Sequence, residues 1–250
     1  MPISSGTIKF ISSLRQKKVR QNYNKFTAEG GRIVGELLRQ TRYRVDHLYA
    51  LEDWQDNAAT APDVPLTRVT ARELGRISQL TTPNQVLAVV DLPNPADVPP
   101  PDLSGWSLYL DGVQSPSNLG ALLRIADWFG FATVIGGPGT ADLYNSKSIQ
   151  ASMGSFLRVD FRNADLALVL EAAPAGLPVF GADLTGDSVY TVPPPAAGLL
   201  VIGAEGPGVR PETRGLVNRW LTIPRAAGRE AESLNAAVAA GILCSALRRE

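Results

Sequence analysis

Short apolar runs alternate with helical patterns along the second part of this chain of 250 residues. Runs rich in Val, Ile and Leu predict strands at 107–112, 132–136, 156–159, 178–182, 198–203 and 220–223. Apolar residues that recur every three or four positions predict helices at 118–129, 165–174 and 233–247. Strands that alternate with helices favour a parallel sheet with helices on both faces.

The helix predicted at 118–129 has one continuous apolar stripe, formed by Leu119, Leu122, Leu123, Ala126 and Phe129. Arg124 lies off this stripe, so the pattern leaves its side chain free to face a site. Asn118 stands at the expected start of the helix, where asparagine is a good N-cap. Ser233 is expected to cap the last helix in the same way.

The first 90 residues mix the two patterns. Helical spacing relates Ile8, Ile11 and Leu14, and a second helical face is predicted for Phe26, Ile33 and Leu37. Strand-like pieces follow at 45–50, 66–69 and 85–90. This part of the chain therefore predicts a small α/β domain.

A proline-rich stretch separates the two parts. Five prolines stand between Asp91 and Asp102, and proline fixes the backbone and donates no hydrogen bond. The stretch is typical of a stiff linker. We therefore expect a first domain at residues 1–91, a linker at 92–103 and a second domain at 104–250.

The equal numbers of basic and acidic residues, 24 each, hide an asymmetry. Residues 1–44 contain ten basic and two acidic side chains, a net charge of +8. A basic segment on a neutral protein is expected where one part of the molecule meets a polyanion such as RNA. A solvated helix face is the alternative explanation.

Composition narrows the class of protein. The chain is 44% hydrophobic and 19% charged, which is typical of a globular fold. It has no apolar run of about 18 residues and no signal-peptide pattern, so we expect no membrane partner and a cytoplasmic location. With one histidine, His47, and one cysteine, Cys244, we expect no metal site. Cys244 falls in an apolar helical pattern and is expected to be a buried, inert thiol.

Three stretches carry the chemistry. The first is 111–124, which reads Asp-Gly-Val-Gln-Ser-Pro-Ser-Asn-Leu-Gly-Ala-Leu-Leu-Arg and follows a predicted strand. The second is 201–208, where glycines at a strand's carboxyl end let the backbone approach a ligand or simply make a tight turn. Its G-x-x-G-x-G spacing is not the dinucleotide fingerprint. The third joins Ile223-Pro224 to residues 233–241.

Together these stretches resemble the signature motifs of the SpoU (TrmH-like) family of RNA 2′-O-ribose methyltransferases, within the SPOUT superfamily. The resemblance is close from 107 to 247. It is looser from about 8 to 90, where Leu14–Arg20, Glu29-Gly30 and 77–89 resemble an L30e-like substrate-binding domain. It implies a parallel α/β fold with a C-terminal trefoil knot, a homodimer, S-adenosylmethionine as methyl donor without a metal, and a structured RNA substrate, above all 23S ribosomal RNA.

The resemblance also assigns residues. The implied catalytic residues are Asn118, Arg124, Glu205, Ser233 and Asn235. The implied cofactor-binding residues are Gly203, Ala204, Glu205, Gly206, Gly208, Ile223, Pro224, Ser233 and Leu234. The implied RNA-binding residues are Arg15, Lys17, Lys18, Arg20, Lys25 and Arg124. The family's mechanism makes Arg124 a general base. Because a guanidinium keeps its proton at neutral pH, we favour a role for Arg124 in stabilising the developing alkoxide.

Several points stay open at this level. Ser115 and Ser117 stand where many relatives carry Asp and Gly, which is expected to alter the loop geometry. Residues 145–155 resemble the family's Ser-x-Gly turn segment or are a polar loop, and 225–232 form a lid or a solvated loop. The alternative functions are 2′-O-methylation of transfer RNA, methylation of a base nitrogen, and non-catalytic RNA binding in ribosome assembly.

Overall fold

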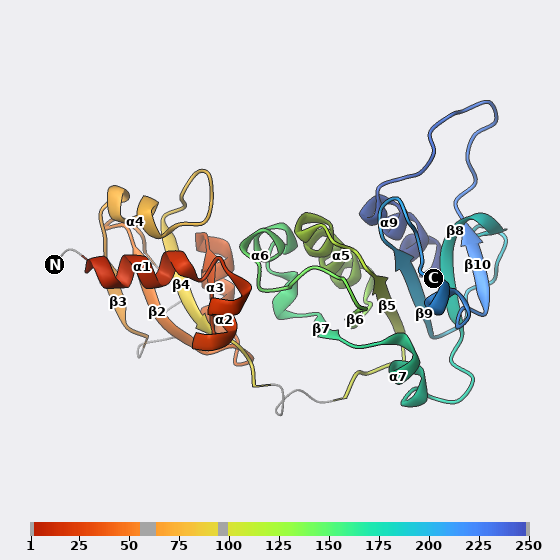
Figure 1. Cartoon of the computed structure of the whole chain (residues 1–250), viewed down its shortest axis with the longest axis horizontal. Coiled ribbons are helices and arrows are strands. Elements are labelled where there is room, and N and C mark those ends of the chain that lie inside the picture. The colour runs from red at the N-terminus through yellow and green to blue at the C-terminus, as the bar shows by residue number, and fades with distance from the viewer. Residues whose placement is uncertain (1–2, 56–63, 95–99, 249–250) are drawn as a thin grey trace.

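The computed structural model describes residues 3–94 without 56–63, and residues 100–248. It contains two β-sheets, one in each part of the chain (Figure 1). The N-terminal sheet has the order β1-β4-β2-β3 and consists of β1 (Lys25–Glu29), β2 (Val45–Ala50), β3 (Leu66–Arg68) and β4 (Val86–Asp91). β4 runs antiparallel to β1 and β2, and β3 runs parallel to β2.

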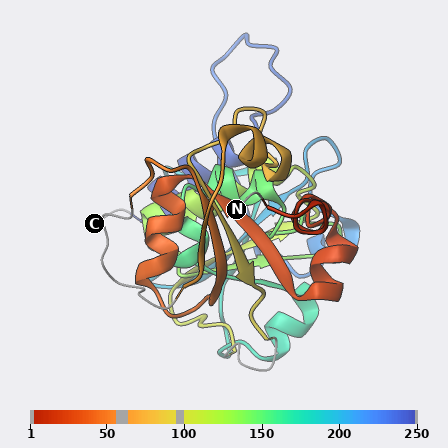
Figure 2. The ribbon, with the colours of Figure 1, turned by 90° about the vertical axis from the view of Figure 1, so that its left-hand side faces the viewer.

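Helices lie on both faces of this sheet, as the end-on view in Figure 2 shows. They are α1 (Ser5–Ser13), α2 (Lys17–Tyr23), α3 (Gly31–Arg39) and α4 (Ala71–Ile77). Ile11 of α1, Ile77 of α4 and Leu87 of β4 share one core. Leu37 of α3 packs with Phe26 of β1 on the other side. The small α/β domain predicted for this region is therefore confirmed.

The second sheet has six strands, all parallel, in the order β10-β8-β9-β5-β6-β7. The strands are β5 (Trp106–Asp111), β6 (Thr133–Gly136), β7 (Asp160–Asn163), β8 (Val179–Ser188), β9 (Gly198–Gly203) and β10 (Arg219–Thr222). Every residue of β5 is buried. Leu108 and Leu110 enter one core and Tyr109 enters the other, because successive side chains point to opposite faces of a sheet.

The helices of this part are α5 (Pro116–Phe129), α6 (Ser146–Ser152), α7 (Leu166–Glu171), α8 (Pro211–Arg214) and α9 (Ala236–Leu247). α5 and α9 cover one face, where Leu123 and Leu243 join the same core. α7 covers the other face through Leu166 and Val169. The predicted α/β class with a parallel sheet covered on both faces is therefore confirmed.

Two predicted elements are wrong. The strand expected at 156–159 is a 3₁₀ helix, η2 (Ser155–Leu157), because Gly154 turns the chain with φ 96° and the strand begins only at Asp160. Phe26 does not share a helix with Ile33 and Leu37. It lies in β1 and reaches the same core from the sheet, which helical spacing alone could not distinguish.

Both predicted caps are also wrong. Ser115 is the N-cap of α5, and its Oγ accepts a hydrogen bond from the backbone N–H of Asn118 at 3.3 Å. Pro116 stands at the first helical position, which proline favours. Asn235, not Ser233, caps α9. As a result the side chain of Asn118 is not used to cap its own helix.

The two parts of the molecule share a core. Phe26 and Tyr43 from the N-terminal part pack against Tyr144 and Phe156, with ring centroids 4.8 to 6.4 Å apart. Across the same junction, Arg20 Nη2 lies 2.5 Å from Asp142 Oδ2 in an ion pair. The linker predicted at 92–103 lies partly outside the described residues, which omit 95–99. The limits 1–91 and 104–250 therefore stay predictions.

Candidate active site

A pocket of about 420 Å³ opens at the carboxyl ends of β9 and β10, beside the middle of β8, and is closed on one side by the start of α9. Open parallel sheets bind ligands at this edge, and the volume is within the range of small-molecule sites. Its walls are formed by 182–184, 202–209, 221–225, 231–234 and the single residues Arg214, Ala236, Ala239 and Leu243.

All nine residues predicted to bind the cofactor line this one pocket. They come from three separate segments and are Gly203, Ala204, Glu205, Gly206, Gly208, Ile223, Pro224, Ser233 and Leu234. The fold thus brings together what the sequence could only group by resemblance. Their role toward a cofactor stays a prediction.

The glycine-rich loop after β9 is a small closed turn. Ala204 and Gly208 exchange backbone hydrogen bonds of 3.1 and 3.0 Å. Gly206 and Gly208 have φ values of 89° and 71°, which residues other than glycine rarely adopt. A Cβ at either position would meet nothing within 4 Å, so the bare backbone faces open space. The loop therefore offers backbone groups to a ligand at short range.

An ion pair ties this loop to the central strand. Asp111, at the end of β5, is fully buried. Its carboxylate accepts hydrogen bonds of 2.7 Å from both the backbone N–H and the guanidinium Nε of Arg210. The hydrogen bond to Asp111 raises the pKa of Arg210. Sequence reasoning assigned Asp111 no role, although its place directly after a buried strand was a usable signal.

A row of polar side chains lies at the edge of the pocket. Asn118 donates from Nδ2 to Glu205 Oε1, and its Oδ1 accepts from Asn235 Nδ2 at 3.2 Å. Asn235 Oδ1 in turn accepts from the backbone N–H groups of Ala237 and Val238. The network joins α5, the glycine-rich loop and α9, and it fixes which end of each amide donates. Three of the five predicted catalytic residues therefore meet directly.

The other two predicted catalytic residues lie apart from this network. Ser233 is exposed and lines the pocket. Arg124 is exposed and is not part of the pocket wall. It follows Asn118 by six residues, about 240° around a helix, so the two side chains leave α5 on different sides. Within the described part of the chain Arg124 makes no hydrogen bond or ion pair.

The predicted RNA-binding cations divide into two groups. Arg15, Lys17 and Lys18 are exposed on and beside α2. Arg20 is 3% exposed, donates to the carbonyl oxygens of Leu14 and Arg15, and pairs with Asp142. Its role is therefore structural, and the predicted RNA contact is wrong.

Lys25 is also engaged within the protein. Its ammonium pairs with Asp91 at 2.5 Å and with Asp46 at 3.1 Å. Burial acts to lower the pKa of Lys25, but the hydrogen bonds to the two carboxylates outweigh it and the pKa is raised. An ammonium held by two carboxylates has little to offer a phosphate, so Lys25 is a poor candidate for RNA contact.

Two charged residues of the pocket wall were missed. Asp183 follows the start of β8, and Arg214 ends α8. The sequence signalled neither, because Asp183 and Arg214 lie on different elements and meet only in the folded structure. Leu243, an apolar residue of the pocket wall that α9 contributes, was also missed.

The remaining candidate residues are structural. Cys244 is buried in α9, and burial raises the pKa of its thiol. His47 Nε2 lies 2.8 Å from Thr67 Oγ1. Among the described residues there is no group of three or more metal-ligating side chains. In the same part of the chain, every helix is too short or too polar to cross a bilayer.

The fold and site define a class: a parallel α/β protein with a small-molecule pocket at its carboxyl edge, joined to a small α/β domain. The SpoU rRNA Methylase family model matches residues 105–245, and the MRM3-like substrate binding domain matches residues 6–88. The chain belongs to the SpoU rRNA methylase family.

Individual relatives agree with this assignment. The Bacillus subtilis protein named 23S rRNA (guanosine(2553)-2′-O)-methyltransferase RlmP is 29% identical over 243 residues, which are 96% of this chain and 95% of that protein. A TrmH-family RNA methyltransferase structure from Porphyromonas gingivalis is 40% identical, with a TM-score of 0.87 and 99% of each chain covered. An AdoMet-bound rRNA methyltransferase structure from Sinorhizobium meliloti is 26% identical, with a TM-score of 0.82, and covers 99% of this chain and 97% of that chain.

Proposed function

We propose that this protein transfers the methyl group of S-adenosylmethionine to a ribose 2′-hydroxyl of ribosomal RNA, and that its substrate is 23S rRNA. The single observation that carries the proposal is the pocket lined by all nine predicted cofactor residues, with the Asn118–Glu205–Asn235 network at its edge. The names of the B. subtilis and S. meliloti relatives support both the reaction and the RNA class.

The pocket suits the proposed methyl donor. Ile202, Leu221 and Leu243 form an apolar wall that fits a purine ring. Gly206 and Gly208 present bare backbone, and Glu205 places a carboxylate where a sulfonium cation is favoured. When bound, S-adenosylmethionine supplies the methyl group and leaves as a neutral thioether.

The residues around the pocket divide the remaining work. Asn118, held by Glu205 and Asn235, positions the target ribose, because its amide is fixed at both ends. Arg124 stabilises the 2′-oxygen as the hydroxyl gives its proton to solvent water, and it binds a neighbouring phosphate. Ser233 contributes a hydroxyl on the pocket side of the ribose.

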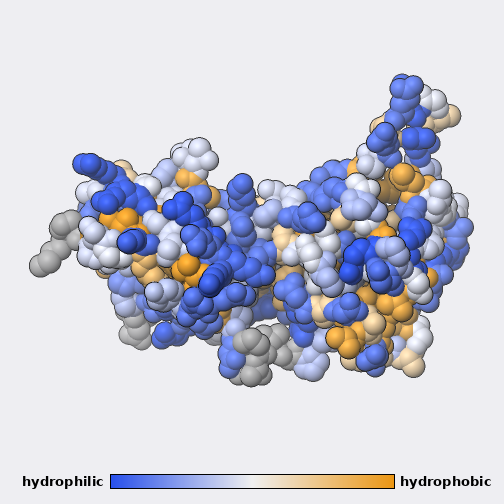
Figure 3. Space-filling view, viewed as in Figure 1, coloured by the Kyte–Doolittle hydropathy of each residue, from blue (hydrophilic) through white to orange (hydrophobic). Residues whose placement is uncertain are grey.

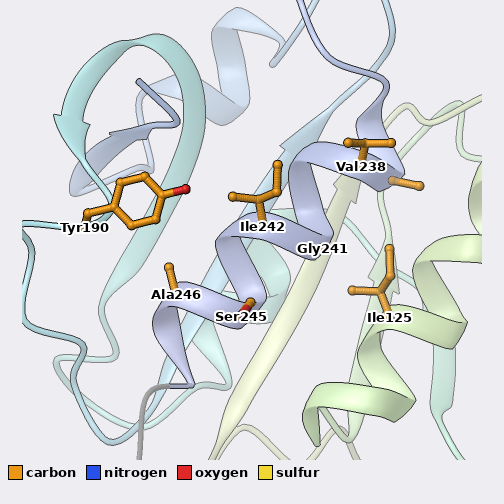
Figure 4. A pocket seen from close by; sticks show the side chains of 8 residues that line it. Ile125, Tyr190, Val238, Gly241, Ile242, Ser245 and Ala246 are labelled. Atoms are coloured by element: carbon orange, nitrogen blue, oxygen red, sulfur yellow. The ribbon is translucent and has the colours of Figure 1, made fainter. Parts of the chain in front are cut away.

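We further propose that the protein is a homodimer built on α5 and α9. Figure 4 shows an open groove in which Ile125 of α5 and Tyr190 flank α9 from opposite sides. Its floor includes Val238, Gly241 and Ile242. Val238 is 52% exposed and Tyr190 is 53% exposed, which a monomer would leave in water. Small residues such as Gly241 allow a second helix to approach closely.

A dimer also explains the position of Arg124. Within one chain this side chain is exposed and absent from the pocket wall. Ile125, the next residue, lines the groove, so Arg124 stands at the rim of the proposed interface. We therefore propose that Arg124 acts at the active site of the partner subunit.

Paired inactive variants test this arrangement. We expect Asn118→Ala and Arg124→Ala homodimers to be inactive, and their purified heterodimer to recover about half of the wild-type rate, because one of its two sites is then intact. A heterodimer as inactive as both parents shows that the arginine acts within its own chain.

The interface itself is tested by Ile242→Asp, which should yield a monomer in light scattering. A dimer that survives this change contradicts the interface.

The N-terminal domain is proposed to bind RNA through Arg15, Lys17 and Lys18, by phosphate contacts and RNA shape.

The proposal also includes the domain limits 1–91 and 104–250, the C-terminal trefoil knot and the cytoplasmic location. Ribosomal rather than transfer RNA is favoured because the named relatives that cover both domains act on rRNA.

The reaction is tested by mapping ribose methylation in ribosomal and transfer RNA after incubation with the purified protein and labelled S-adenosylmethionine. We expect one 2′-O-methyl nucleotide in 23S rRNA, lost with Asn118→Ala and kept with Arg219→Ala. Arg219 is a matched control because it pairs with Asp187 outside the pocket. Absence of methylation on all RNAs, with retained RNA binding, favours the non-catalytic alternative.

A further inference from the structure

The pocket wall formed by β8 and α8 carries a cationic group, the guanidinium of Arg214, whose position is fixed by neighbouring side chains. Arg214 Nη1 donates to Asp183 Oδ2 at 2.7 Å. The guanidinium carbon lies 4.2 Å from the ring centroid of Trp220, a distance typical of a cation–π contact. Both Arg214 and Asp183 line the pocket. The guanidinium is thus held from two directions at the pocket wall.

Asp183 is oriented by further contacts. Its Oδ1 accepts from the backbone N–H and the hydroxyl of Thr185 at 3.0 and 3.1 Å. Burial acts to raise the pKa of Asp183, but the hydrogen bonds from Thr185 and Arg214 outweigh it and the pKa is lowered. The carboxylate therefore stays charged and fixes the arginine at neutral pH.

Arg214 keeps unused donors in this position. A guanidinium carries five N–H groups in a planar fork, and only Nη1 has a hydrogen bond within the described residues. Arg225, the other arginine of the pocket wall, donates instead to the carbonyl oxygen of Ala231 in an exposed segment. That segment projects from the body of the molecule (Figure 3). Arg214 is the better-fixed cation.

We propose that Arg214 binds the carboxylate of the methionyl end of S-adenosylmethionine, and that Asp183 and Trp220 are positioning residues for it. The inference rests on the proposed function and deepens it. A planar guanidinium matches a carboxylate with two parallel hydrogen bonds. Arg214 lies on the β8 side of the pocket, and Glu205 lies on the β9 side with the reactive network.

The test compares two ligands by calorimetry on the full-length protein. Decarboxylated S-adenosylmethionine lacks only the carboxylate, so it should bind the wild type about tenfold or more weakly than S-adenosylmethionine. Arg214→Met keeps an unbranched chain over Trp220 without the charge. We expect it to bind the two ligands within about threefold of each other, and Arg214→Lys to restore part of the discrimination.

Arg219→Ala removes an arginine outside the pocket, so it is the matched control and should discriminate like the wild type. Thermal denaturation checks that each variant is folded. If folded Arg214→Met still discriminates fully, the carboxylate is bound elsewhere and the inference fails. If that variant loses RNA affinity instead, the arginine faces a phosphate, which also overturns it. If the wild type binds neither ligand, the proposed function itself fails.

Discussion

Gly120 offers a stringent test of how the site is positioned. It lies on α5, two residues after Asn118, where the helix packs on α6. A Cβ at this position would stand 2.5 Å from the Cβ of Ala151, 2.5 Å from the carbonyl oxygen of Ser148 and 2.8 Å from the backbone nitrogen of Ser152. Two of these atoms are backbone, so no side chain can turn aside. The helices must separate by about 1 Å to accept Gly120→Ala.

Two effects of this substitution oppose each other. Alanine is favoured over glycine in a helix by about 1 kcal/mol, whereas over-packing costs about 3 kcal/mol when backbone must move. We expect a net loss of about 2 kcal/mol, which lowers the melting temperature by about 4–8 °C for a chain of this size. The displaced Asn118 should lower kcat by about tenfold to a hundredfold, with the KM for the methyl donor almost unchanged.

Gly75→Ala is the matched control for Gly120→Ala. Gly75 lies in α4, and a Cβ there would be 3.9 Å from Pro83, an ordinary contact. This change should raise the melting temperature by about 1–4 °C, since only the helix preference acts. Calorimetry and steady-state methylation assays measure both variants. If Gly120→Ala also gains stability and keeps its kcat, the close approach of α5 and α6 does not position Asn118.

Three further predictions follow from other contacts. Asp111→Asn should weaken S-adenosylmethionine binding by about tenfold in calorimetry, because the buried carboxylate no longer holds Arg210 and its loop; unchanged affinity contradicts this role. Burial raises the pKa of Glu29 despite its hydrogen bonds from Ser78 and Gln79. Glu29 therefore lowers the stability of the native state as pH rises from the ordinary pKa of 4.5 through the raised one. Glu29→Gln should flatten that decline in denaturation midpoints measured from pH 4 to 7, and an unchanged profile refutes it. Asp142→Asn should cost about 2–4 kcal/mol in chemical denaturation, because it leaves the buried Arg20 charge uncompensated; a loss below about 1 kcal/mol places the stability of the junction elsewhere.

The sequence by itself determined the repeating strand and helix pattern of the second part, because a buried parallel strand needs a nearly continuous apolar run. The strand predicted at 198–203 matches β9 residue for residue, and 45–50 matches β2. The motifs also predicted which residues would meet at the pocket. The local caps failed because Ser115 and Asn235 compete with nearby polar residues that look equally suitable.

Only the tertiary structure decided which charges are free and which are engaged. Arg20 and Arg124 look alike in the sequence, yet one is buried against Asp142 and the other is exposed. Strand order placed β8 beside β9 and so brought Asp183 and Arg214 to the pocket. Local periodicity reports which face of an element is apolar, but partners more than a hundred residues away are chosen by packing. For that reason the sequence indicated the site, and the fold selected its residues.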